Sequence, residues 1–181
     1  LAALLHDSGK PACRTVDQQG VAHFYGHAKE SARLAEEALR KLRCENALRR
    51  QVVELVELHD LWGPPTLPSA RRWLGRLGEE GLRDLLALER GDTLAHAPHC
   101  RSPRLERLER WEQLLEQVLQ ERDCISLREL AVDGKDLLAL GFSPGPALGA
   151  ALCFLLEEVV EGRLENQRDS LLAALNEAPR I

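Results

Sequence analysis

The chain has 181 residues, of which 44% are hydrophobic and 29% charged, and it carries a formal net charge of -5. It is long enough to bury the core of one large domain or two small ones, and no apolar run approaches the roughly 20 residues that span a bilayer. These properties favour a soluble globular protein and exclude one that spans a membrane.

Charge and cysteine usage narrow the class further. Residues 101–181 hold 10 Lys and Arg against 15 Asp and Glu, so the basic stripe typical of nucleic-acid binding is missing there. The five cysteines are an odd number without a CxxC pair, which indicates reduced thiols in a cytoplasmic protein. The chain has no methionine and starts within an apolar pattern that lacks a capping residue, so we expect it to be a piece of a longer protein.

The apolar spacing predicts helices almost throughout the chain. Residues 1–7 are predicted to be the last part of a helix, which Gly9 and Pro11 terminate. Residues 8–26 are expected to be irregular. The helices predicted after this segment are 27–43, 46–61, 69–77, 79–97, 104–121, 126–131, 134–140, 146–161 and 167–177. Residues 96–103 are typical of a linker, so His96 and His99 are expected to be solvated. The sequence therefore predicts an all-α fold with a domain boundary near residue 100.

Two of the predicted helix ends share one pattern. The segments "ALLHDSGKP" and "VELHDLWGPP" each end an apolar helix with His-Asp and continue with Gly and Pro. Two such ends that meet in a helical bundle place imidazoles and carboxylates around one cavity. A histidine that opens another helix and an aspartate within "RGDTLAH" are candidates for the same place. The full candidate set is His6, Asp7, His27, His59, Asp60 and Asp92.

Mixed His and Asp ligation suits a divalent ion such as Mn, Ni, Co, Fe, Zn or Mg. Such an ion lowers the pKa of a bound water and polarises a phosphoryl oxygen, and Lys10 stands three residues after Asp7, where it can offset charge on a phosphate. A His-Asp pair is also explained by a capped helix end with a hydrogen-bonded histidine, and Asp92 by a surface carboxylate. The residues alone leave both a metal site and a structural role open.

Several motifs together resemble a known family. "LLHDSGKP" resembles the HDxGKP element of HD-domain phosphohydrolases. The segments "HFYGHAKESARLAEEALRKLR", "LVELHD" and "ARRWLGRLGEEGLRDLLALERGDTLA" resemble the HD region of bacterial CCA-adding tRNA nucleotidyltransferases, a group related to poly(A) polymerases. The tail "DGKDLLALGFSPGPALGAALCFLLEEVVEGRLENQRDSLL" is similar to the C-terminal helical region of that family, so the resemblance covers nearly the whole chain.

The resemblance implies a role for each residue that matches the family's motifs. The implied metal ligands are His6, Asp7 and Asp92. The implied catalytic residues are Asp7 and Lys10. The implied pocket residues are His27, His59 and Asp60. The family's first metal-ligating histidine and its N-terminal nucleotidyltransferase head are missing here, and Ser8 replaces a usual aliphatic residue. We therefore expect weakened metal affinity and no CCA addition by this chain alone.

The tail segment "PGPALGAALCFLLEEVVEG" has small residues that permit close helix packing, and a packing role would be enough to explain it. The resemblance implies that this region holds the tRNA elbow, with backbone amides near Gly145 and Gly149 facing phosphates.

We expect an HD-type metal-dependent phosphohydrolase domain at 1–100 and a tRNA-binding helical tail at 101–181. The expected partners are tRNA, the missing head, and a phosphoester or nucleotide substrate. Two alternatives stay open: a vestigial HD site with a purely structural, tRNA-binding role, and a free-standing HD nucleotide phosphohydrolase.

Overall fold

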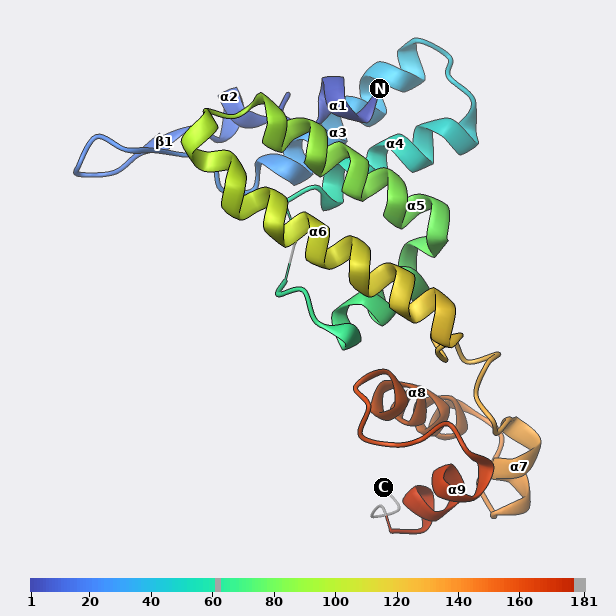
Figure 1. The fold of residues 1–181 in the computed structure, drawn as a ribbon. Coiled ribbons are helices and arrows are strands. Elements are labelled where there is room, and N and C mark those ends of the chain that lie inside the picture. The colour runs from blue at the N-terminus through green and yellow to red at the C-terminus, as the bar shows by residue number, and fades with distance from the viewer. Residues whose placement is uncertain (61–62, 178–181) are drawn as a thin grey trace. The chain divides into compact units, whose positions relative to one another are not determined.

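The computed structural model describes residues 1–60 and 63–177, which are almost entirely helical (Figure 1). The helices are α1 Ala2–Leu5, α2 Lys10–Cys13, α3 His27–Lys41, α4 Asn46–Leu58, α5 Leu67–Ala95, α6 Pro98–Glu121, α7 Gly134–Ala139, α8 Pro146–Val160 and α9 Arg168–Glu177. A two-stranded antiparallel ribbon pairs β1 Thr15–Val16 with β2 Ala22–His23. The prediction of an all-α fold is confirmed. No described helix is both long and apolar enough to cross a membrane.

Three local predictions differ from the structure. Residues 8–26 contain α2 and the ribbon, whose turn is closed because the Asp17 carboxylate accepts hydrogen bonds from two following amides. The predicted linker at 96–103 is wrong because α6 begins at Pro98 and includes Pro103, close to its N-terminus, where a missing amide removes only one intrahelical bond. The predicted helix at 126–131 is instead a turn, in which the Glu129 carboxylate accepts hydrogen bonds from the Ile125 amide and the Ser126 hydroxyl.

The chain divides into two compact units. Unit 1 comprises residues 1–64 and 77–112, and unit 2 comprises residues 65–76 and 113–181. Helices α5 and α6 contribute residues to both units, and α5 is broken at Gly78, whose backbone angles are φ 69° and ψ 174°. This break agrees with the prediction of separate helices on either side of residue 78. The functional boundary near residue 100 stays a prediction.

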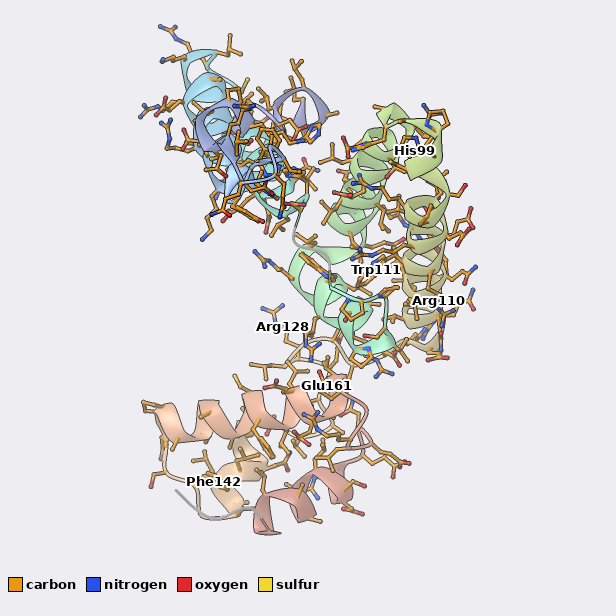
Figure 2. The ribbon with its side chains drawn as sticks, turned by 90° about the vertical axis from the view of Figure 1, so that its left-hand side faces the viewer. His99, Arg110, Trp111, Arg128, Phe142 and Glu161 are labelled. Atoms are coloured by element: carbon orange, nitrogen blue, oxygen red, sulfur yellow. The ribbon has the colours of Figure 1, made fainter. Side chains whose placement is uncertain are left out.

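Unit 1 is built on the pairing of α3 with α4. The buried stripe of α3 is rich in alanine, with Ala28, Ala32 and Ala35 followed by Leu39, so the two helices approach closely. Helices α5 and α6 run side by side (Figures 1 and 2), and the buried residues that they supply to this unit include Leu82, Leu85, Leu108 and Trp111. The unit thus consists of helices whose ends carry the predicted site residues.

Unit 2 has its own apolar core. The buried residues of this core are Cys124, Leu130, Val132, Leu137, Leu155, Val159, Leu171 and Leu175. Two polar side chains tie its loops together: Arg71 donates to the Asp123 carboxylate and the Val160 carbonyl, and Asn166 bonds the backbone on both sides of Leu130. These bonds satisfy the last carbonyl of α8 and two backbone groups of the turn before α7.

Candidate metal centre

The His6-Asp7 pair stands where α1 ends and the chain turns toward α2. Gly9 lets this turn lie directly on α3, because its amide donates to the Ser31 hydroxyl at 2.8 Å. A Cβ added at Gly9 would lie 2.6 Å from the Ser31 amide nitrogen and 2.7 Å from the His27 carbonyl oxygen. The close backbone contact therefore requires glycine, and it brings the His-Asp pair to the first turn of α3.

Three imidazoles meet in unit 1, and the backbone sets the tautomer of each. The Nδ1 atoms of His6, His27 and His59 lie 3.0, 2.9 and 2.7 Å from the carbonyl oxygens of Ala3, Phe24 and Val56. Because a carbonyl oxygen only accepts, each Nδ1 carries a hydrogen and donates it. In the neutral form of each ring, Nε2 is then the nitrogen that can bind a cation.

These Nε2 atoms face one another and the Asp7 carboxylate. His27 Nε2 lies 3.2 Å from His59 Nε2, within hydrogen-bond distance. Asp7 Oδ1 lies 3.5 Å from His27 Nε2 and 3.8 Å from His59 Nε2, and within the described residues this buried oxygen accepts no hydrogen bond. A cation among these atoms would give the Asp7 oxygen the partner that it lacks among the described residues.

Lys10 and the imidazoles stabilise the ionised form of Asp7. Burial by itself would raise the pKa of the Asp7 carboxyl, but the hydrogen bond from Lys10 Nζ at 2.6 Å and positive charge on His6 outweigh burial and lower it. Burial also lowers the pKa of His59, which keeps this ring neutral. Asp7 is thus present as a carboxylate, which is the form in which it binds a metal ion.

Asp92 reaches the same place from α5, far along the chain. Its Oδ1 lies 3.3 Å from His6 Nε2. His96, one turn later, donates from Nδ1 to the Asp92 carbonyl at 2.8 Å, and its side chain is 34% exposed. His96 lies in the short connection between α5 and α6 and is only partly solvated, because its ring also packs against the site. His99 lies in the first turn of α6 and is exposed, as expected.

One cavity of about 270 Å³ joins these residues. The predicted residues that line it are His6, Asp7, Lys10, His27, His59, Asp60 and Asp92. Asp60 stands at its mouth, with a side chain that is 67% exposed, and its Oδ2 lies 3.9 Å from His27 Nδ1. The structure thus brings the seven candidates of the N-terminal part together, while their chemical roles stay predictions.

Helix α6 supplies a wall of this cavity that the sequence reasoning missed. Its lining residues are Arg104, Arg107, Leu108 and Trp111, which are spaced as one helical face. The sequence predicts a helix at 104–121, but nothing in that prediction assigned one of its faces to the cavity. The signal that could have revealed the wall is the amphipathic placement of two arginines next to a tryptophan.

The donor set fits a divalent cation. Ligand atoms of His6, Asp7 and His59 all lie within 4.8 Å of one another, close to the separation of roughly 4 Å between opposite ligands of an ion with bonds near 2.1 Å. Nitrogen and carboxylate donors together suit Mn, Fe, Co, Ni or Zn better than Ca. Asp7 Oδ1 is buried without a hydrogen bond among the described residues, so this oxygen could serve as a ligand of such an ion.

The tail candidates lie in unit 2, at the start of α8. Gly145 precedes the helix with φ 138° and ψ -162°, and the Gly149 amide donates to the Gly145 carbonyl at 3.3 Å. Since the Gly149 amide is used inside the helix, any contact made by this residue with a ligand would depend on its missing side chain. No described atom lies within 4 Å of a Cβ built at either glycine, so the surface here is open.

Comparison with known proteins gives the same family as the motifs. Residues 15–175 match the family described as tRNA nucleotidyltransferase domain 2. The chain is 35% identical over 172 residues to a CC-adding tRNA nucleotidyltransferase of Thermus thermophilus, covering 94% of this chain and 38% of that protein. It is 32% identical over 177 residues to an A-adding tRNA nucleotidyltransferase of Deinococcus radiodurans, covering 93% of this chain and 39% of that protein.

A shorter match joins the chain to a CCA-adding enzyme of Limosilactobacillus fermentum, with 51% identity over 49 residues, which are 27% of this chain and 12% of that enzyme. No significant match was found among solved structures. The chain spans about two fifths of the length of the first two relatives. Because the family match covers most of the chain, the resemblance is confirmed. The chain belongs to the family of tRNA nucleotidyltransferase domain 2.

Proposed function

We propose that the chain combines an HD-type, metal-dependent phosphohydrolase site with a helical tail that binds tRNA, as part of a tRNA nucleotidyltransferase. The metal ligands in this proposal are His6, Asp7 and Asp92, with His27, His59 and Asp60 around them. The observation that carries it is a set of three imidazoles, each held through Nδ1 by a backbone carbonyl, beside a buried carboxylate oxygen around one cavity.

The chain's own residues account for substrate positioning at this site. Lys10 Nζ is bonded to Asp7 Oδ2 and its side chain is 37% exposed, so it can also reach a phosphate oxygen at the cavity mouth. Asp7 orients Lys10 and presents its other oxygen to the imidazoles. A bound divalent ion supplies polarisation of the phosphoryl oxygen and a water that is a strong nucleophile at neutral pH.

Metal uptake tests this proposal directly. The purified chain, dialysed with Mn²⁺ and then against metal-free buffer, should retain about one equivalent of the ion by mass spectrometry. Replacement His6→Ala should reduce retention by at least about tenfold, because it removes an Nε2 ligand. His99→Ala, an exposed histidine outside the cavity, is the matched control and should retain as much Mn²⁺ as the unaltered chain. Equal retention by the two variants would contradict the site.

Hydrolysis is tested on the same proteins. The Mn²⁺-loaded chain should release nitrophenol from bis(4-nitrophenyl) phosphate, and Lys10→Ala should lower the rate while keeping the ion. If the loaded chain holds Mn²⁺ but hydrolyses no phosphoester, the vestigial alternative is correct and the unit has a structural role.

The tRNA part of the proposal is supported by family membership and by the names of the relatives, which add CC or A to tRNA. The candidate contact of unit 2 with tRNA is the open surface at Gly145 and Gly149, near the start of α8. Equal affinity of the chain for tRNA and for an unstructured RNA of the same length would exclude specific recognition by the tail.

A further inference from the structure

The α6 wall of the cavity combines an apolar base with exposed cations. Leu108 and Trp111 are 6% and 1% exposed, whereas Arg104 and Arg107 are exposed. Figure 2 shows Trp111 on the side of α6 that faces α5, whereas Arg110 points away from α5 and does not line the cavity. Residues 104, 107, 108 and 111 therefore form a face that is closed by apolar groups and carries guanidinium groups at the cavity.

The two arginines are held differently. Arg107 donates to the Gly63 carbonyl at 2.8 Å, so a backbone contact positions it. Arg104 Nη1 donates to His96 Nε2 at 3.2 Å and lies 3.7 Å from Asp92 Oδ2, which is an ion pair but too long for a hydrogen bond. Its side chain is 52% exposed, and a guanidinium has five N–H donors. Most donors of Arg104 thus remain available to an anion.

Arg104 closes a row of contacts between basic and acidic side chains. Lys10 contacts Asp7 at 2.6 Å, Asp7 contacts His6 at 3.4 Å, His6 contacts Asp92 at 3.3 Å, and Asp92 contacts Arg104 at 3.7 Å. A cationic side chain therefore stands at each end of this row: Lys10 at one end and Arg104 at the other. A phosphoryl group at the centre of this row would meet Lys10 on one side and the planar fork of Arg104 on the other.

We propose that Arg104 is a phosphate-binding residue of this site, which pairs with Asp92 in the absence of an anion and binds the oxygens of a phosphoester when one is bound. The inference rests on the proposed function, because it places the phosphoester in the cavity of the metal centre. It adds a recognition residue, from a helix outside the His-Asp motifs, and it assigns Asp92 two competing cationic partners: Arg104 and a divalent ion.

Competition at Asp92 predicts effects of opposite sign. Arg104→Gln removes a positive charge near a metal ligand, so Mn²⁺ should bind about three- to tenfold more tightly to this variant. The same change removes the fork that binds the anion, so inorganic phosphate should bind the Mn²⁺-loaded variant about fivefold or more weakly. Arg104→Lys keeps the charge, so its Mn²⁺ affinity should stay near that of the unaltered chain.

The experiment is isothermal titration of the full chain with Mn²⁺ alone, and then of the Mn²⁺-loaded chain with inorganic phosphate. Arg110→Gln is the matched control: it removes the same charge from a residue of α6 that does not line the cavity, and it should change neither affinity. If Arg104→Gln weakens the binding of both Mn²⁺ and phosphate, or changes neither affinity, as Arg110→Gln should, Arg104 does not bind phosphate and the inference is wrong. If the unaltered chain takes up no Mn²⁺, the proposed metal site fails and the role of Arg104 fails with it.

Discussion

At the scale of single residues, Gly9 has a larger structural role than its position beside the His-Asp pair suggests. Its backbone lies against the Ser31 amide and the His27 carbonyl, and its amide donates to the Ser31 hydroxyl. The glycine thus couples the turn that carries Asp7 to the helix that carries His27. The distance between Asp7 and His27 depends on this contact, because it fixes the turn that carries Asp7 against the first turn of α3.

Replacing Gly9 with Ala should lower the free energy of unfolding of the chain by about 1–3 kcal/mol, since a Cβ would overlap backbone atoms that cannot move easily. It should also weaken Mn²⁺ binding by separating α2 from α3. Gly91→Ala is the matched control: Gly91 lies in α5, no described atom lies within 4 Å of an added Cβ, and Ala should stabilise the helix by about 0.5–1 kcal/mol. Urea titrations with opposite shifts of the midpoint would support both assignments, and equal shifts would contradict them.

At the scale of elements, the short helix α7 shows how polar groups stabilise a segment with little apolar surface. Asp133 and Asp136 form a capping box at its start, in which each carboxylate accepts a hydrogen bond from the backbone amide of the other residue. Arg168 of α9 donates to Asp136 Oδ1 at 2.7 Å, so the cap also joins two helices of unit 2.

This pairing gives the stability of unit 2 a dependence on pH. The hydrogen bond from Arg168, followed by that from the Asp133 amide, lowers the pKa of Asp136 below its ordinary value of 3.8. A lowered carboxyl pKa stabilises the fold at pH values above 3.8, and this stabilisation is lost as the pH falls through the pKa of the folded state. Arg168→Gln should therefore lower the midpoint of urea unfolding at pH 7.

The difference between this variant and the unaltered chain should decrease as the pH falls below about 4, and it should vanish once Asp136 is protonated in both. Circular dichroism during urea titration at several pH values measures the effect. Asp169→Asn is the control. Asp169 is the neighbour of Arg168 in α9, but the Arg168 guanidinium donates to Asp136, so this variant should keep the pH dependence of the unaltered chain. A constant difference across the whole pH range would show that Arg168 acts through packing instead of charge.

At the scale of the whole molecule, the acidic balance limits how the chain can bind RNA. The chain carries 29 acidic against 24 basic residues, and many arginines are already paired with carboxylates, as Arg33, Arg72 and Arg163 are. This pairing reduces the positive charge that is available to displace counterions from phosphates. Recognition of tRNA by this chain, as proposed above, must depend more on shape and backbone contacts than on net charge.

A shallow salt dependence follows from this charge balance. If about three phosphates or fewer are neutralised, the affinity of the chain for tRNA should fall by less than about 50-fold between 50 and 200 mM KCl. Filter binding at several salt concentrations measures the slope. A steep slope, equivalent to six or more phosphate contacts, would show a basic surface that the sequence does not suggest.

The helical pattern and the two His-Asp motifs could be predicted from the sequence because both depend on short spacings. The cavity-facing orientation of His6 and Asp7 could not, since it depends on the contact of Gly9 with α3 and on carbonyl groups that select each imidazole tautomer. His96 was assigned to a linker because Pro98 and Pro103 suggest a break, yet proline is tolerated near the start of α6.

The sequence by itself therefore determined the helical class, the family, and the identity of the residues at the helix ends, because periodicity and local motifs are properties of neighbouring residues. Only the tertiary structure decided that Asp92 meets His6 across 86 positions, and that Arg104 stands beside them on α6. These contacts depend on how α5 and α6 pack in unit 1. The burial of Leu108 and Trp111 sets which face of α6 the arginines share, and no local pattern specifies which partner that face will meet.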